Sequence, residues 1–267
     1  MSAKLAKFMP VLSACLLVVS CTLLTALGNK PWGWVLLGLC PISLIGQKQK
    51  FIRDMSLLIL AMILVGLTPV NTNLDAPHLV IMSVGLIAAA ALPYFISRYI
   101  YKDRAIRFKL NPKRLWNKKD IFYLAIWLLL SYFILPIYFA TTGAHANWTV
   151  EPSFHSLSLL FYGTNSVGAW DEFFFICTVL AILRRHLPFW LANCLQAIMF
   201  VSFLYELGFT GWAFVPLYIF ALLQGTIFRR TESLLYVLVV HLSIDFILYL
   251  ALIHAHYPQF VPIFITG

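Results

Sequence analysis

Four acidic residues and one histidine lie inside long apolar stretches of the sequence, where charged groups are rare. They are Asp171, Glu172, Glu206, His241 and Asp245. A carboxylate at the centre of a membrane helix costs at least about 2.5–3.5 kcal/mol on insertion scales, so such residues normally face a bundle interior or a wet cavity. There a carboxylate can take a proton from water, pass protons along a relay, or bind a metal ion beside an imidazole. These five side chains are the candidate functional residues.

Two of these residues share one face of a predicted helix. His241 and Asp245 are four positions apart, so they lie one turn apart on the same side and can act on one centre. Asp171 and Glu172 are adjacent and point about 100° apart, so one of them can face His241 while the other needs a different partner. We expect Glu172 to face inward.

Depth in the membrane provides a second criterion. Counted from Arg184 at about 1.5 Å per helical residue, Glu172 lies roughly 18 Å above the cytoplasmic edge. Counted from Arg230 in the same way, His241 lies at roughly 16 Å and Asp245 at roughly 22 Å. Ionisable groups from two separate helices are therefore expected in one layer.

The helices that position these groups follow from composition. Apolar residues make up 61% of the 267 residues and charged residues 11%, and the mean hydropathy is +0.87, which excludes a soluble globular domain. Apolar runs long enough to cross a hydrocarbon core recur along the whole chain. The sequence predicts an all-α, polytopic transmembrane helix bundle of nine spans, with eight as the alternative. The spans are placed at 10–28, 31–46, 55–70, 79–97, 121–141, 160–183, 187–206, 211–228 and 233–253.

The distribution of basic residues predicts the orientation. With nine crossings, all lysines and arginines except Lys30 fall on the side of the N-terminus, which the positive-inside rule assigns to the cytoplasm. The C-terminus is then outside, and we expect a bacterial inner membrane. We divide the chain into N-terminal helices with a basic cytoplasmic loop, 1–119, and a C-terminal transmembrane core, 120–267. The loop at 98–119 is expected to dock on anionic lipid headgroups; topology explains the positive charge, so no nucleic-acid partner is expected.

Two motifs stand in the second half of the chain. The sequence DEFFFIC at 171–177 is followed by LRRHLP, and FRRTESL at 228–234 leads into HLSID at 241–245. These segments resemble the EExxxR motif and the "yrrTgSl" segment with HxxxN or HxxxD of the CPBP family, the CAAX-protease and bacteriocin-processing membrane endopeptidases also called abortive-infection proteins. The resemblance covers about residues 160–253. Its most specific part is the combination of Thr231, Ser233 and the HxxxD spacing.

The chain departs from the family pattern at two places. Asp171 stands where the family has its first glutamate, and Ile176 replaces the family's arginine. The middle motif, FxxxH, should supply a histidine on the intervening helix, but residues 199–209 contain none. Glu206 is the nearest polar substitute. Whether the altered motifs permit turnover is left open by these differences.

The resemblance implies a bundle of about eight helices in which a glutamate activates water for peptide hydrolysis, while histidine and asparagine support the oxyanion. Carried onto this chain, Glu172 is the candidate base and His241 the candidate oxyanion donor. Asp245 would orient His241 or accept a hydrogen bond from the substrate amide, and Asp171 and Glu206 complete the candidate catalytic set. The expected activity is membrane-embedded endopeptidase cleavage of a prenylated, leader-peptide or other membrane-associated substrate.

A metal-dependent mechanism is the alternative that the same family suggests. Glu206 lies at the outer end of its span, at about 30 Å by the helical rise, unless that helix breaks or tilts inward. If Glu206 does reach the centre, Glu172, Glu206 and His241 form a plausible set for a divalent metal such as zinc. No other cofactor is expected.

Two further functions compete with the endopeptidase. The first is a non-catalytic relative of the family, a binding or immunity protein, in which the buried charges only stabilise the helix packing. The second is a proton-coupled transporter, which can use intramembrane Asp, Glu and His as a relay. The sequence lacks the paired half-repeats with Gly or Pro interruptions that are typical of many such transporters.

Overall fold

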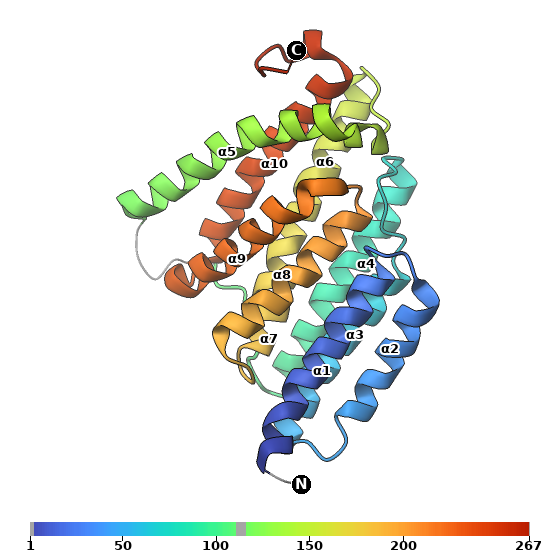
Figure 1. The fold of residues 1–267 in the computed structure, drawn as a ribbon, viewed down its shortest axis with the longest axis vertical. Helices are drawn as coiled ribbons and strands as arrows, with labels where there is room; N and C mark the ends of the chain where they lie inside the picture. Colours follow the sequence, from blue (N-terminus) through green and yellow to red (C-terminus); the bar gives the residue numbers. More distant parts are fainter. Residues whose placement is uncertain (1–2, 111–115, 267) are drawn as a thin grey trace.

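The computed structural model describes residues 3–110 and 116–266. Over these ranges all regular secondary structure is helical, and the helices join into nine rods (Figure 1). The rods are α1 (Ala3–Leu24), α2 (Lys30–Ser43), α3 (Gln49–Leu67), α4 (Ala76–Phe95) with η1 (Ile96–Ile100), α5 (Lys118–Thr142), α6 (Phe154–Asp171) with η3 (Glu172–Leu180) and α7 (Ala181–Leu183), α8 (Phe189–Glu206), η4 (Gly211–Ala213) with α9 (Phe214–Thr231), and α10 (Leu234–His256). The short helices η2 (Ala144–Asn147) and η5 (Pro258–Phe260) lie outside the rods. The predicted all-α bundle of nine helices is confirmed for the described residues.

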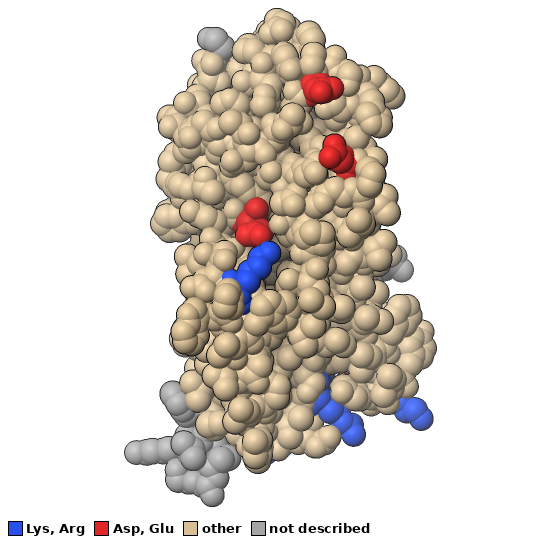
Figure 2. All heavy atoms as spheres, turned by 90° about the vertical axis from the view of Figure 1, so that its right-hand side faces the viewer, with Lys and Arg blue, Asp and Glu red and all other residues tan. Residues whose placement is uncertain are grey.

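Six rods are long and apolar enough to cross a membrane, among the residues that the structure describes. The outer rods also carry large apolar side chains on their surface, such as Val80 at 62% exposure and Phe122 at 67%. On the face shown in Figure 2, most of the surface carries neither basic nor acidic side chains. An apolar surface of this kind is stable in lipid and unfavourable in water. The chain is an integral, multi-pass membrane protein.

The rod formed by α6, η3 and α7 lies deepest in the bundle. About 78% of its most apolar stretch is buried inside the protein, compared with 22% for α5 and 33% for α4. It packs against α4 and α10 through α6 and against α8 through η3. A polar side chain on this rod therefore faces protein on nearly every side.

Contacts among the even-numbered loops place those loops on one side of the bundle. Arg185, between α7 and α8, forms ion pairs with Asp54 in the first turns of α3, at 3.2 Å, and with Asp103 after η1, at 2.6 Å. Lys109 in the same loop as Asp103 pairs with Glu232, which separates α9 from α10, at 2.5 Å. Four loops that alternate in the chain therefore meet.

The odd-numbered loops meet on the opposite side. Lys30 at the start of α2 interacts electrostatically with Glu206 at the end of α8. The side-chain amide of Asn147, between α5 and α6, donates to the carbonyl of Gly208 after α8, at 2.8 Å. In Figure 1 the two chain ends also lie at opposite ends of the molecule. This arrangement is the alternating topology that the distribution of basic residues predicts.

Local signals fix the ends of the helices that flank the deepest rod. Asn117 and Asp120 form a reciprocal capping box at the start of α5, with bonds of 3.0 and 2.8 Å. Ser233 caps α10 by accepting a hydrogen bond from the backbone N–H of Tyr236, at 3.2 Å. The Tyr236 hydroxyl in turn donates to the carbonyl of Asp120, at 2.7 Å. The first turns of α5 and α10 are thus tied together, which sets the depth of every residue that follows in α10.

One acidic residue lies deeper than its position in the sequence indicates. The sequence places Asp54 just before a span at 55–70, but α3 begins at Gln49, and Asp54 is only 2% exposed. Asp54 pairs with Arg185 and accepts a hydrogen bond from His186 at 2.6 Å, so its charge is compensated inside the bundle.

Replacing Asp54 with alanine is expected to destabilise the protein by about 3 kcal/mol, because the change leaves the half-buried Arg185 with one acidic partner instead of two. The measurement is thermal unfolding of the detergent-solubilised protein. Asp75→Ala is the matched control, since Asp75 is exposed and its side chain caps nothing; it should change stability by less than about 0.5 kcal/mol. Equal losses in both variants would contradict a structural role for the Asp54 ion pairs.

Candidate active site

The candidate residues of the deepest rod and of α10 lie together in the interior. Asp171 ends α6, Glu172 begins η3, and His241 and Asp245 lie on α10, which packs against both elements. All four are buried, with exposures of 2% for the two adjacent acids, 4% for His241 and 6% for Asp245. Acid and imidazole groups from the sixth and ninth rods therefore share one site.

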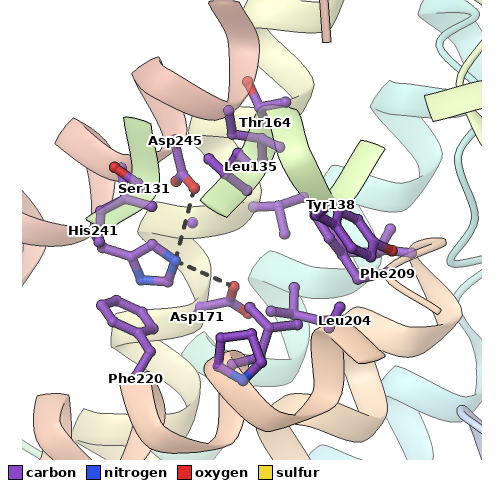
Figure 3. A pocket seen from close by; sticks show the side chains of 18 of the residues that line it. Ser131, Leu135, Tyr138, Thr164, Asp171, Leu204, Phe209, Phe220, His241 and Asp245 are labelled. Carbon is purple, nitrogen blue, oxygen red and sulfur yellow. Dashed lines mark ion pairs between the residues drawn. The ribbon is translucent and has the colours of Figure 1, made fainter. Parts of the chain in front are cut away.

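The His241 imidazole is the centre of this cluster. Its Nδ1 lies 2.8 Å from Oε1 of Glu172, within hydrogen-bonding distance. Its Nε2 lies 4.0 Å from Oδ2 of Asp171 and 3.9 Å from Oδ1 of Asp245, the two ion pairs drawn in Figure 3. The two ring nitrogens thus face different partners, and Glu172 holds the ring from the side opposite the two aspartates.

The adjacent acids reach opposite sides of one imidazole at the point where the helix changes type. A regular α-helix turns about 100° per residue, which led to the expectation that only one of the two would face His241. The segment from Glu172 to Leu180 is a π-helix, in which the hydrogen bonds run to the fifth residue and the rotation per residue is smaller. π-Helical turns occur frequently at functional sites. Both Asp171 and Glu172 face inward.

Two glutamines that sequence reasoning did not single out complete the site. Gln224 of α9 donates from its amide to Oε1 of Glu172, at 2.9 Å, and to the carbonyl of Val237. Gln196 of α8 donates to Asn193 and to the carbonyl of Ala221. Both glutamines are almost fully buried. Their position within apolar spans is itself a signal, since amide side chains in membrane helices usually form hydrogen bonds between helices.

Several buried oxygens of the site have no hydrogen-bond partner among the described residues. They are both carboxylate oxygens of Asp171, one each of Glu172 and Asp245, and the amide oxygens of Gln196 and Gln224. A buried acceptor without a hydrogen-bond partner costs about 1–3 kcal/mol. A group of six such oxygens at one site therefore indicates a role in binding water or substrate.

The main cavity of the candidate active site lies beside His241, on the side of the two aspartates. It has a volume of about 140 Å³, and Asp171, His241 and Asp245 form its charged wall. The rest of its lining is largely apolar and aromatic; Tyr138, Leu204, Phe209 and Phe220 are labelled in Figure 3. Such a lining suits an apolar ligand whose reacting group meets a few polar side chains.

A second, smaller void lies on the other side of the acid pair. It measures about 10 Å³ and is lined by Asp171, Glu172, Gln196 and Gln224 together with aromatic residues. A void of roughly this size holds about one water molecule when polar partners surround it. Asp171 lines both spaces, whereas Glu172 lines only the small one.

Glu206 does not join this cluster. It ends α8 in a half-buried position near Lys30 and lines neither of the two cavities. Among the described residues, no three His, Cys, Asp or Glu side chains are arranged to hold a metal ion, so the set of Glu172, Glu206 and His241 does not fit zinc in this arrangement.

Two positions fit the spacing of the missing family histidine. Leu204 lies four positions after Phe200 and Leu207 four positions after Phe203, and both leucines line the main cavity. Ile176, which replaces the family's arginine, is buried at 3% exposure and lines the small void. Both departures therefore put apolar side chains at the site.

Comparison with known proteins agrees with this site. Residues 153–247 match the family model described as Rce1-like, type II CAAX prenyl endopeptidase. The matched segment runs from the start of α6 to just beyond Asp245 in α10, so it contains every residue of the charged cluster. No curated protein and no solved structure shows significant similarity to the chain. Over its α6–α10 segment, this membrane protein is similar to the Rce1-like type II CAAX prenyl endopeptidases.

Proposed function

We propose that the protein is an intramembrane endopeptidase that hydrolyses a peptide bond of a prenylated or otherwise membrane-associated peptide. The match of residues 153–247 to the Rce1-like family model supports the CAAX-type endopeptidase class. The observation that carries the proposal is the buried His241 imidazole, with Glu172 behind it and two aspartates beside it, at the wall of an apolar cavity. A lipidated or apolar peptide fits such a cavity better than a polar one.

We assign roles to three of the four residues from their positions. Asp171 borders the main cavity, neither of its carboxylate oxygens has a hydrogen-bond partner among the described residues, and it is our candidate for taking the proton from the attacking water. Glu172, bonded to Nδ1, orients His241. Nε2 then faces the cavity, where it accepts a proton in the neutral ring and donates to a developing oxyanion in the protonated ring. This proposal moves the base from Glu172 to the neighbouring Asp171, because Asp171 is the acid that a substrate in the cavity meets.

The test is cleavage of defined peptides by the purified, detergent-solubilised protein. A farnesylated peptide, its unprenylated counterpart and a bacteriocin-leader peptide are offered to the wild type and to His241→Ala. We expect the wild type to cleave at least one of them, and the variant to lose about 10²–10³-fold in kcat/KM because one oxyanion donor is removed. Equal cleavage by both proteins would exclude His241 from the reaction.

A chelation arm separates the two mechanisms that the family suggests. Activity that survives exhaustive dialysis against EDTA supports water activation by a carboxylate. Activity that is lost on dialysis and restored by zinc would show a metal-dependent reaction, and would require the side chains to rearrange from the positions described above.

A non-catalytic binding protein is the second candidate, and the apolar Ile176 and Leu204 at the site favour it. The comparison is Leu204→His, which puts an imidazole at a position with the family spacing on the cavity wall. If the native chain is an enzyme with a reduced middle motif, this variant should raise kcat/KM by about tenfold or more, because a positioned acid–base group contributes on that scale. Leu217→His, which puts an imidazole on the cavity lining from α9 and outside the FxxxH spacing, is the control. An equal response to both changes would contradict the assignment of position 204.

The orientation is also a proposal. We infer that the side on which Asp54, Asp103, Arg185 and Glu232 meet is cytoplasmic, since it collects the basic loops. The N-terminus is then inside and the C-terminus outside, in a bacterial inner membrane. Cysteine labelling from either side of intact cells, at exposed positions of the loops, tests this inference.

A further inference from the structure

A second cavity, separate from the candidate active site, lies where the even-numbered loops meet. Its volume is about 270 Å³, and its lining comes from the loop after η1, from η3 and α7, and from the α9–α10 turn. Five of its lining side chains are basic and two are acidic, an excess of three positive charges. The basic ones are Arg104, Arg107, Lys109, Arg184 and Arg185.

The two acids of this cavity are already engaged. Asp103 pairs with Arg185 at 2.6 Å, and Glu232 pairs with Lys109 at 2.5 Å. In the part of the chain that the structure describes, Arg104, Arg107 and Arg184 form no ion pair, and all three are exposed. The pairs fix two of the cations in place. Arg107 donates from Nε to the carbonyl of Arg104 at 3.0 Å, so its two terminal nitrogens and the guanidinium groups of Arg104 and Arg184 are left to meet a ligand.

The segment that carries these cations is anchored rather than loosely attached. The backbone N–H of Asp103 donates to the carbonyl of Ser97 at 2.9 Å, and the N–H of Leu234 donates to the carbonyl of Lys109 at 2.8 Å. Between them Ile106 is 1% exposed, and the ring of Phe108 packs against that of Phe173 in η3 with centroids 5.1 Å apart. Because the scaffold is already ordered, a ligand would not have to order this segment on binding.

We propose that this cavity binds a phosphate-bearing anion, and that its source is the headgroup of an anionic phospholipid. Guanidinium groups match phosphate oxygens in a bidentate geometry, which is why arginine clusters recognise phosphate. The cavity lies on the side that collects the basic loops, where an anionic leaflet attracts clustered Lys and Arg. The sequence predicted that the loop at 98–119 docks on lipid headgroups, and the proposal assigns this binding to one cavity. Residues 111–115 of that loop lie outside the described residues. Free inorganic phosphate shares the chemistry and is the alternative source.

The experiment is a titration of the protein in a non-ionic detergent with short-chain phosphatidylglycerol, short-chain phosphatidylcholine or inorganic phosphate. Binding is measured by intrinsic tryptophan fluorescence and by thermal unfolding. Arg107→Gln/Arg184→Gln is compared with Lys50→Gln/Arg230→Gln. Both variants remove two positive charges from exposed side chains on the same side of the bundle, but only the first pair lines the cavity.

We expect phosphatidylglycerol to bind the wild type and the control variant equally, and to bind the cavity variant at least tenfold more weakly, with little response to phosphatidylcholine. An equal loss of phosphatidylglycerol affinity in both variants would show that surface charge alone causes the binding, and would overturn the proposal. Equal binding of both lipids to the wild type would overturn it as well. Saturation by inorganic phosphate that depends on Arg107 and Arg184, without any response to phosphatidylglycerol, would keep a phosphate site but overturn the lipid as its source.

Discussion

Asp171→Asn is expected to lower kcat/KM for peptide cleavage by about 10²–10⁴-fold, because it removes the carboxylate that we propose as the general base while keeping the side chain's shape. The carboxylate oxygens of Asp171 have no hydrogen-bond partner among the described residues, and Asp171 is the acid of the adjacent pair that borders the main cavity. The measurement is steady-state cleavage of a prenylated peptide, with thermal unfolding recorded in parallel to show that the variant is folded.

Glu172→Gln is the matched comparison at the neighbouring position. Gln224 donates to Oε1 of Glu172, and this bond would keep an amide oxygen directed at Nδ1 of His241. Only the charge of the acceptor is lost, so we expect kcat/KM to decrease by about tenfold. This factor corresponds to the difference in strength between a charged and a neutral hydrogen bond. If Glu172→Gln proved far more damaging than Asp171→Asn, Glu172 would be the base after all, as the family motif suggested.

Gly168→Ala should abolish most of the activity and lower stability by about 1–3 kcal/mol, because it overpacks the contact between α6 and α10. A Cβ atom at this position would lie 1.7 Å from Oδ2 of Asp245 and 3.3 Å from the ring of His241. The side chains of Asp245 and His241 would have to move, and a displacement of about 1 Å in a catalytic group can reduce turnover about 100-fold. Cleavage kinetics and thermal unfolding together measure both effects.

Gly163→Ala is the control on the same helix. Its Cβ would meet only Leu74 and Leu79, at 3.6 and 3.7 Å, which is ordinary van der Waals contact. It should leave activity unchanged and raise stability by up to about 1 kcal/mol through helix propensity. Adding Asp245→Ala to Gly168→Ala should recover stability without recovering activity. A Gly168→Ala protein that cleaved normally would show that the close approach of α6 and α10 does not position Asp245.

The sequence alone was sufficient for the helices and their topology. A backbone in lipid must satisfy its hydrogen bonds internally, so each apolar run becomes a helix whatever its neighbours are. The alternation of basic loops then determined the up-and-down order that the contacts of Asp54, Arg185 and Glu232 display. The i, i+4 spacing placed His241 and Asp245 on one face, since that relation is internal to a single helix.

Only the tertiary structure decided which polar groups meet. Both adjacent acids lie next to His241, at the junction where a π-helix begins at Glu172, and no helical periodicity in the sequence indicates this junction. Gln224 reaches Glu172 from another rod, whereas Glu206 remains outside the cluster. These outcomes depend on how far each rod is rotated and shifted against its neighbours. Packing between residues far apart in the chain sets that rotation, so the residue pattern within one span does not predict it.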